Sequence, residues 1–167
     1  MNAAPSRTAA RKPARPRPFD SPEQEGFLAL WRTYDRLRAY EDELFGRHDL
    51  TPQQYNALRL LAGERPQPLR TLDLARRLVS RAPDITRLLD KLERRGLIER
   101  SRPAENRRVV YVGLTESGLA LLDALRGPIR ECHARQLGHL SRKELKDLVA
   151  LLRVARRPHE DATSGWR

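Results

Sequence analysis

Residues 81–100, RAPDITRLLDKLERRGLIER, combine basic and hydrogen-bonding side chains at helical spacing. Asp84, Arg87, Lys91 and Arg94 follow one another at intervals of three or four residues, which places them on one face of a helix. A helix can present such a face to the major groove of DNA when its opposite face packs on a scaffold. The stretch therefore predicts a recognition helix.

The first turns of a recognition helix meet the base edges, and the chemistry of the side chains decides which edges they fit. Arginine donates in bidentate fashion to guanine, threonine offers a hydroxyl and a methyl group, and aspartate accepts from cytosine. We expect base contacts from four residues, namely Arg81, Asp84, Thr86 and Arg87. Lys91 and Arg94 lie further along the helix, where we expect phosphate contacts. The alternative for Arg87 is a surface ion pair with Asp84 or Asp90.

Apolar residues on the other face of this helix predict how it is held. They recur at helical spacing as Ile85, Leu88, Leu89, Leu92 and Leu97, and Gly96 is a natural C-terminal stop. A shorter helix is predicted over 71–78, with an inward face made of Leu72, Leu74, Ala75 and Leu78. A tight turn at 79–81 joins the two helices, and Pro83 falls in the first turn of the second one. This arrangement predicts a helix-turn-helix.

A β-hairpin is predicted directly after the recognition helix, in LIERSRPAENRRVVYVGL (residues 97–114). Two runs with β-branched and aromatic residues flank a polar turn at 103–106. We expect a basic tip made by Arg100 and Arg102 on one side and by Arg107 and Arg108 on the other. An arginine on a thin β-ribbon fits a minor groove, and Arg107 or Arg108 is suited to that contact.

Two hydroxyl residues near the predicted helix starts complete the candidate surface. Thr71 and Ser80 are suited to phosphate contacts, through their hydroxyls or through the N–H groups of a helix start. Ordinary helix capping explains both residues equally well, and the two roles are compatible.

Further helices are predicted on both sides of this block. Start signals stand at 21–24, 51–54 and 141–144, each a Ser or Thr followed three residues later by Gln or Glu. Thr115 caps another helix, which Gly127–Pro128 should kink or break. The terminal helices carry more leucine than one small lobe could cover, which is typical of an interface.

The predicted fold class is therefore mainly α with a small β-hairpin wing: a winged helix-turn-helix lobe plus N- and C-terminal dimerisation helices. The expected division is a disordered basic tail over 1–18, an N-terminal dimerisation helix over 19–48, a DNA-binding domain over 49–115, C-terminal dimerisation helices over 116–157 and a loose tail over 158–167.

The net charge of +11 over 167 residues is concentrated in two segments. Residues 69–111 hold twelve basic against six acidic side chains, and residues 1–18 hold five basic and no acidic ones. Such a block is the electrostatic footprint of a phosphate backbone, although a solvated surface gives the same composition. The single cysteine, and the lack of an apolar run of signal-peptide or membrane-spanning length, lead us to expect a soluble cytoplasmic chain.

Taken together, the predicted helix-turn-helix, the hairpin and the helices around them resemble the MarR family of bacterial transcription regulators over about residues 24–157. LRTLDLARRLVSRAPDITRLLDKLERRGLIER is similar to the family's helix-turn-helix, and NRRVVYVGLTESG is similar to its wing and the start of its long dimer helix. The resemblance implies a homodimer whose first, fifth and sixth helices interlock and whose two lobes bind a pseudo-palindromic operator. It also implies that a small-molecule or oxidant signal relieves repression.

One position departs from that family pattern. In the family an aspartate near the wing tip orients the arginine two residues later, and this position is Asn106 here, before Arg108 and beside Glu105. The family's salt bridge is therefore lost or displaced in this chain.

The resemblance also implies an effector crevice between the dimer helices and the DNA-binding lobe. Residues in about the right segments for a small aromatic effector are Trp31, Tyr34, His48 and Tyr55. An aromatic stripe is also typical of a core, which is the alternative interpretation.

The chain offers little other reactive chemistry. Peroxide-sensing relatives use a cysteine in the first helix, which has none here, and Cys132 is expected to be a buried, inert thiol. Cys132, His133 and His139 lack convergent zinc spacing, because adjacent residues diverge by about 100° around a helix. No Ser/His/Asp set, phosphate-binding loop or carboxylate pair stands out, so we expect no enzymatic activity, no metal and no cofactor.

These observations predict a sequence-specific DNA-binding transcriptional regulator, and we expect a repressor rather than an activator. Two alternatives stay open. A nonspecific nucleoid-type DNA-binding protein would depend on the basic tail and show little base preference. A winged-helix interaction module would dock a protein partner and would not depend on Arg87 or Arg108.

Overall fold

The structure is a computed structural model that describes residues 19–79 and 84–160. Its elements follow one another as α1 (Pro22–Gly46), α2 (Pro52–Glu64), β1 (Leu69–Arg70), α3 (Thr71–Arg77), α4 (Ile85–Arg94), β2 (Ile98–Ser101), β3 (Tyr111–Leu114), α5 (Glu116–Leu137), α6 (Arg142–Arg156) and a 3-10 turn, η1 (Arg157–His159). The chain divides into two units, one up to Arg36 and one from Leu37, and α1 contributes to both.

In the first unit, Ser21 caps the start of α1. Its hydroxyl accepts a hydrogen bond from the backbone N of Gln24 at 3.2 Å. The Gln24 side chain accepts from the backbone N of Asp20 at 2.7 Å, so the reciprocal capping box expected between residues 21 and 24 is wrong in its second half. The apolar residues of this part of α1 are exposed, with Phe27 and Trp31 packed ring against ring at 6.0 Å.

In the second unit, the other three start signals are confirmed. Thr51 with Gln54 and Ser141 with Glu144 form complete capping boxes at α2 and α6. Thr115 accepts from the backbone N of Gly118 at the start of α5. α5 runs on through Pro128, so the predicted break is wrong. Buried residues before and after the proline, Leu125 and Ile129, anchor both parts of the helix in the core, which outweighs the missing N–H.

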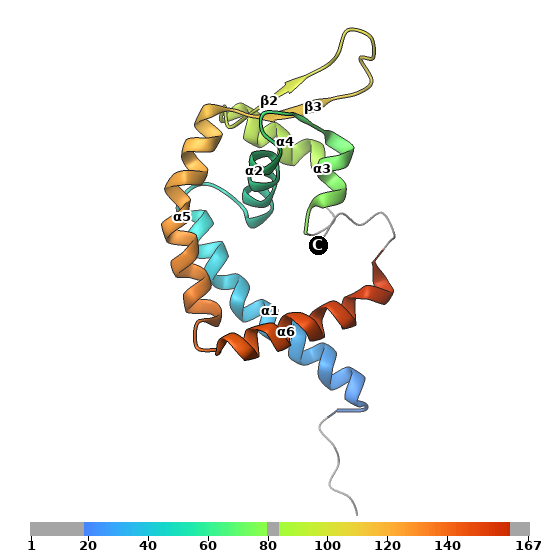
Figure 1. Cartoon of the computed structure of the whole chain (residues 1–167), viewed down its shortest axis with the longest axis vertical. Coiled ribbons are helices and arrows are strands. Elements are labelled where there is room, and N and C mark those ends of the chain that lie inside the picture. The colour runs from blue at the N-terminus through green and yellow to red at the C-terminus, as the bar shows by residue number, and fades with distance from the viewer. Residues whose placement is uncertain (1–18, 80–83, 161–167) are drawn as a thin grey trace, which may run out of the picture. The chain divides into compact units, whose positions relative to one another are not determined.

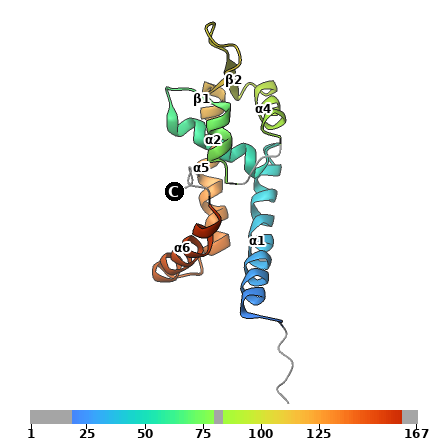
Figure 2. The ribbon, with the colours of Figure 1, turned by 90° about the vertical axis from the view of Figure 1, so that its right-hand side faces the viewer.

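A three-stranded antiparallel sheet in the order β1-β3-β2 carries the hairpin. Ile98 pairs with Leu114 and Ser101 with Tyr111, as expected for the hairpin. The strand β1, which pairs Leu69 with Val112, was not predicted, because two residues are too few for a periodic pattern. Beyond the paired residues the loop between β2 and β3 extends away from α2, α3 and α4, as both views show (Figures 1 and 2).

The core of this unit is formed mainly by leucines from α2, α3, α4 and α5, together with Val112 of β3. The largest fully buried side chains are Leu58, Leu61, Leu74, Leu89, Leu92, Leu125 and Val112. Leu72 was expected to face inward but is 70% exposed. α3 buries Leu74 and is followed by the buried Leu78, and a residue two positions before Leu74 points to the opposite side of a helix.

Candidate nucleic-acid interface

α4 begins one residue after Asp84, which acts as its N-cap. The Asp84 carboxylate accepts a hydrogen bond from the backbone N of Arg87 at 2.9 Å. Asp84 therefore precedes the helix and is not part of its face, which corrects the sequence prediction. It is exposed and still lies at the start of α4, where a base contact was predicted. Ser80, Arg81 and Pro83 lie outside the described residues.

The outward face of α4 is basic and exposed, as the sequence predicted. Leu89 and Leu92 are fully buried beneath it. Its exposed side chains are those of Thr86, Arg87, Lys91 and Arg94. The leucines fix the helix to its lobe, and the polar side chains remain available to a partner.

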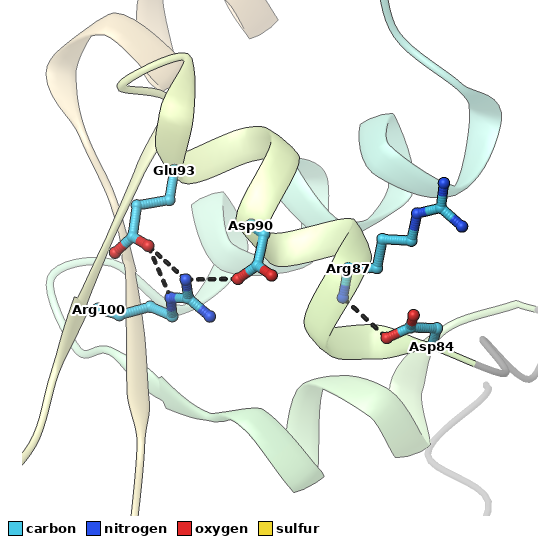
Figure 3. A network of polar contacts seen from close by, with 5 residues as sticks. All are labelled: Asp84, Arg87, Asp90, Glu93 and Arg100. Atoms are coloured by element: carbon cyan, nitrogen blue, oxygen red, sulfur yellow. Dashed lines mark hydrogen bonds and ion pairs between the residues drawn. The ribbon is translucent and has the colours of Figure 1, made fainter.

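Arg87 has no carboxylate partner among the described residues. The bond to Asp84 involves the backbone N of Arg87, and the Asp90 carboxylate contacts Arg100. Figure 3 shows the Arg87 side chain extending away from the cluster that holds Asp90. The alternative of a surface ion pair with Asp84 or Asp90 is therefore wrong for this structure.

Arg100 was expected at the wing tip, but it lies at the base of the wing and contacts α4. Its Nη2 atom donates to Asp90 Oδ1 at 2.6 Å, and its Nε atom donates to Glu93 Oε2 at 2.9 Å (Figure 3). The hydrogen bond from Arg100 lowers the pKa of Glu93, and the same bond raises the pKa of Arg100. The arginine thus neutralises carboxylates of α4 and ties the wing to that helix.

The spacing of Asp90 and Glu93 was the signal that sequence reasoning missed. Two carboxylates three residues apart share one helix face and can hold one guanidinium between them. Which arginine fills that place depends on the path of the chain after Gly96, and that path is a tertiary property.

The wing tip is built from two successive turns around Asn106. The backbone N of Asn106 donates to Pro103 O at 3.2 Å, and that of Val109 donates to Asn106 O at 3.1 Å. The Asn106 side chain accepts from the backbone N of Arg108 at 3.2 Å. The Asn106 side chain therefore contacts the backbone of Arg108, and the side chains of Arg107 and Arg108 are exposed.

Thr71 joins the start of α3 to the wing. Its hydroxyl and its backbone N both donate to Val110 O, at 3.2 and 2.9 Å. The N-cap position of α3 is Arg70, so capping by Thr71 is wrong. A phosphate contact by Thr71 stays a prediction. Arg70 in turn lies over the ring of Tyr111 on β3, at 5.9 Å from its centroid.

The four candidate effector residues are divided between the units. Trp31 and Tyr34 are exposed on the first unit, and His48 and Tyr55 belong to the second. Tyr55 stacks on the buried Phe45 with ring centroids 4.8 Å apart, as the core interpretation predicted. Its burial raises its pKa. A shared effector site of the four residues stays a prediction.

Cys132 is buried on α5, and this burial raises the pKa of its thiol. A raised pKa disfavours the thiolate and hence reaction with oxidants. Among residues 19–79 and 84–160, no three His, Cys, Asp or Glu side chains are grouped as metal ligands. Within the same ranges no helix is long and apolar enough to span a membrane.

The exposed face of α4, the hairpin beside it and the helix-turn-helix core define a winged-helix protein of the DNA-binding type. The MarR family model matches residues 50–110. The homoprotocatechuate degradative operon repressor of Escherichia coli is 31% identical over 125 residues, which cover 75% of this chain and 83% of that protein. The chain belongs to the MarR family of transcription regulators.

Solved structures agree with this assignment. A MarR transcription factor from Planctomyces limnophilus is 54% identical, with a TM-score of 0.66 over 81% of this chain and 98% of that chain. BpsR from Bordetella bronchiseptica, whose DNA binding is regulated by 6-hydroxynicotinic acid, is 26% identical, with a TM-score of 0.70 over 79% of this chain and 98% of that chain.

Proposed function

We propose that this chain is a repressor that binds a pseudo-palindromic operator as a homodimer and acts in the cytoplasm by binding, without enzymatic activity. The observation that carries the proposal is the exposed basic face of α4 above the buried Leu89 and Leu92. The family supports a regulatory role, and the E. coli relative is a repressor by name. The basic surface of the wing and α4 favours DNA over a protein partner.

In this proposal the residues of the interface make different kinds of contact with DNA. Thr86 and Arg87 lie in the first turn of α4 and reach base edges, together with Asp84 and with Arg81 of the preceding segment. Phosphate contacts come from Lys91, Arg94, Thr71 and Ser80. Arg107 or Arg108 enters the neighbouring minor groove.

We also propose that the terminal helices, within 19–48 and 116–157, form the dimer. Exposed apolar residues on α1 and α6 support this, since a monomer would leave them in water. The dimer would place two recognition helices about one DNA turn, ~34–36 Å, apart. A small aromatic effector would relieve binding, as the relative regulated by 6-hydroxynicotinic acid suggests.

Fluorescence anisotropy on the DNA upstream of the protein's own reading frame tests the proposal, with a scrambled duplex as the control at ~150 mM salt. We expect a preference of at least several hundred-fold, about 4 kcal/mol, for the upstream duplex or for one selected from a random pool. Equal affinity for every duplex would favour a nucleoid-type protein. Binding to no duplex would favour a protein partner.

Arg87→Ala is the first variant to measure. It should cost about 1–3 kcal/mol of specific binding and relax base preference at one position of each half-site. Arg59→Ala, which removes an exposed arginine hydrogen-bonded to Asn56 on α2, is the matched control and should bind as the wild type does. An Arg87 variant with unchanged affinity and preference would contradict the assignment of α4 as the reading element.

A further inference from the structure

The recognition helix α4 ends in a turn with a defined hydrogen-bond pattern. The backbone N of Leu97 donates to Leu92 O at 3.1 Å, and that of Gly96 donates to Glu93 O at 2.8 Å. Gly96 is left-handed, with a φ of 67°. This is the Schellman motif that commonly closes helices, and it leaves Arg95 as the C-cap residue of α4.

α1 ends in a turn of the same kind. The backbone N of Leu50 donates to Phe45 O at 3.0 Å, and that of Asp49 donates to Gly46 O at 3.3 Å. Asp49 occupies the left-handed position, with a φ of 51°. Phe45 and Leu50 are both buried, which is the hydrophobic contact that accompanies this motif.

Arg95 connects the two helix ends. Its Nη1 atom donates to Asp49 O at 2.6 Å, and its Nη2 atom donates to His48 O at 3.1 Å. The C-terminal end of a helix carries partial negative charge, so a guanidinium is favourable there. A planar guanidinium that makes two bonds also fixes an orientation, which a single flexible contact does not.

Different contacts restrain α4 in different directions. Leu89 and Leu92 hold its inner face against the core, and Arg100 holds it to the wing. Among the described residues, the side-chain hydrogen bonds between the end of α4 and the turn that follows α1 are those of Arg95. This contact therefore adds a directional, hydrogen-bonded link between α4 and the turn that follows α1.

We infer that Arg95 is a positioning residue for operator recognition: its two hydrogen bonds fix the recognition helix against the end of α1, and thereby the half-site spacing that the dimer accepts. The inference rests on the proposed function, since it requires that α4 read DNA in a dimer formed through α1. Arg95 and its two bonds are exposed, so water can replace them and the fold should survive their loss.

The test compares duplexes of different spacing. The probe is the duplex that the wild-type protein selects from a random pool, and a second version has one base pair inserted between its half-sites, which moves them apart by about 3.4 Å. We expect the wild type to bind the lengthened duplex at least about tenfold more weakly, a difference of ~1.4 kcal/mol. Arg95→Gln should bind the original duplex more weakly than the wild type does. Its affinities for the original and the lengthened duplex should differ by less than about threefold.

Two further variants separate orientation from charge. Arg47→Gln removes the same charge from the residue that directly follows α1, where Arg47 contacts only Glu43 among the described ion pairs, and should retain wild-type spacing preference. Arg95→Lys keeps the charge but not the planar fork, and should give an intermediate preference. Full loss of spacing preference in Arg47→Gln would show that charge alone is responsible and would overturn the inference.

Hydrogen exchange without DNA provides the second readout. Arg95→Gln should accelerate amide exchange in residues 46–50, whereas Arg47→Gln should not. If the wild type prefers one duplex and Arg95→Gln retains both its exchange and its spacing preference, the inference is overturned and the proposed function stands. If the wild type prefers no duplex, the proposed function fails and the positioning role fails with it, whatever the exchange data show.

Discussion

At the residue scale, Asp49 occupies a left-handed backbone position that usually belongs to glycine. Asp49→Gly should raise the free energy of unfolding by about 0.5–1 kcal/mol, because glycine adopts this φ without steric cost. Urea denaturation of the two proteins measures the difference. Asp49→Ala is the control and should be less stable than the wild type. A glycine variant less stable than the alanine variant would show that the aspartate side chain, and not the backbone, determines stability here.

Glu93 makes the stability of the fold depend on pH. Arg100 lowers its pKa in the folded protein, so the pair stabilises the fold fully above the ordinary glutamate pKa of about 4.3. That contribution is lost as the pH falls through the lowered pKa of Glu93. The difference in unfolding free energy between the wild type and Glu93→Gln should therefore be constant above about pH 5 and shrink below pH 4.

Denaturation in urea at four pH values from 3 to 7 would measure this difference. Glu99→Gln, on the exposed side of β2, removes a carboxylate that makes no bond to Arg100, and provides the matched control. A difference that grows on acidification would have the wrong sign for a carboxyl group with a lowered pKa.

At the scale of elements, the start of α5 packs directly on the end of α4. Thr115 donates from its hydroxyl to Gly96 O at 2.7 Å. A Cβ at Gly118 would lie 2.2 Å from Leu97 O and 2.6 Å from Leu114 Cδ1, so only glycine allows this approach. The wing, α4 and α5 thus meet at one point, which makes the angle between them sensitive to a single methyl group.

Gly118→Ala should therefore destabilise the protein by about 1–3 kcal/mol, because the obstacle includes backbone that cannot move cheaply. Gly127→Ala on the same helix meets nothing within 4 Å and should stabilise it by up to about 1 kcal/mol. Thermal unfolding of the two variants makes the comparison. Equal effects of the two substitutions would contradict the packing described for α5.

At the scale of the whole molecule, exposed apolar side chains on α6 support self-association. Leu151 is 69% exposed and Leu72, on α3, is 70% exposed, so the two differ in location and not in accessibility. Light scattering on the wild type should give twice the chain mass of 19.3 kDa. Leu151→Asp should weaken the dimer on the order of tenfold or more, because burying one leucine is worth about 1.5–3 kcal/mol.

Leu72→Asp supplies the control for this measurement, since α3 belongs to the DNA-binding lobe in the proposed function. It should leave the mass unchanged. A monomeric wild type, or equal weakening by both substitutions, would contradict a dimer formed through the terminal helices.

Much of the fold could be predicted because it depends on interactions that are local in the chain. Capping at Thr51, Thr115 and Ser141 joins residues three apart, and the leucine periodicity of α4 lies within one helix. The exposure of Arg87 follows from the same periodicity. Local signals of this kind identify the elements and their outward faces.

The order of the helices, the position of the wing and the basic face of α4 therefore follow from patterns within single elements of the chain. Which residues meet between elements depends on how those elements pack. Arg100 contacts Asp90 rather than the wing tip, Leu72 stays in solvent, and Arg95 crosses to carbonyls more than forty residues earlier in the chain. These contacts depend on how the elements pack in space, and the side-chain periodicity of one element contains no information about the position of another.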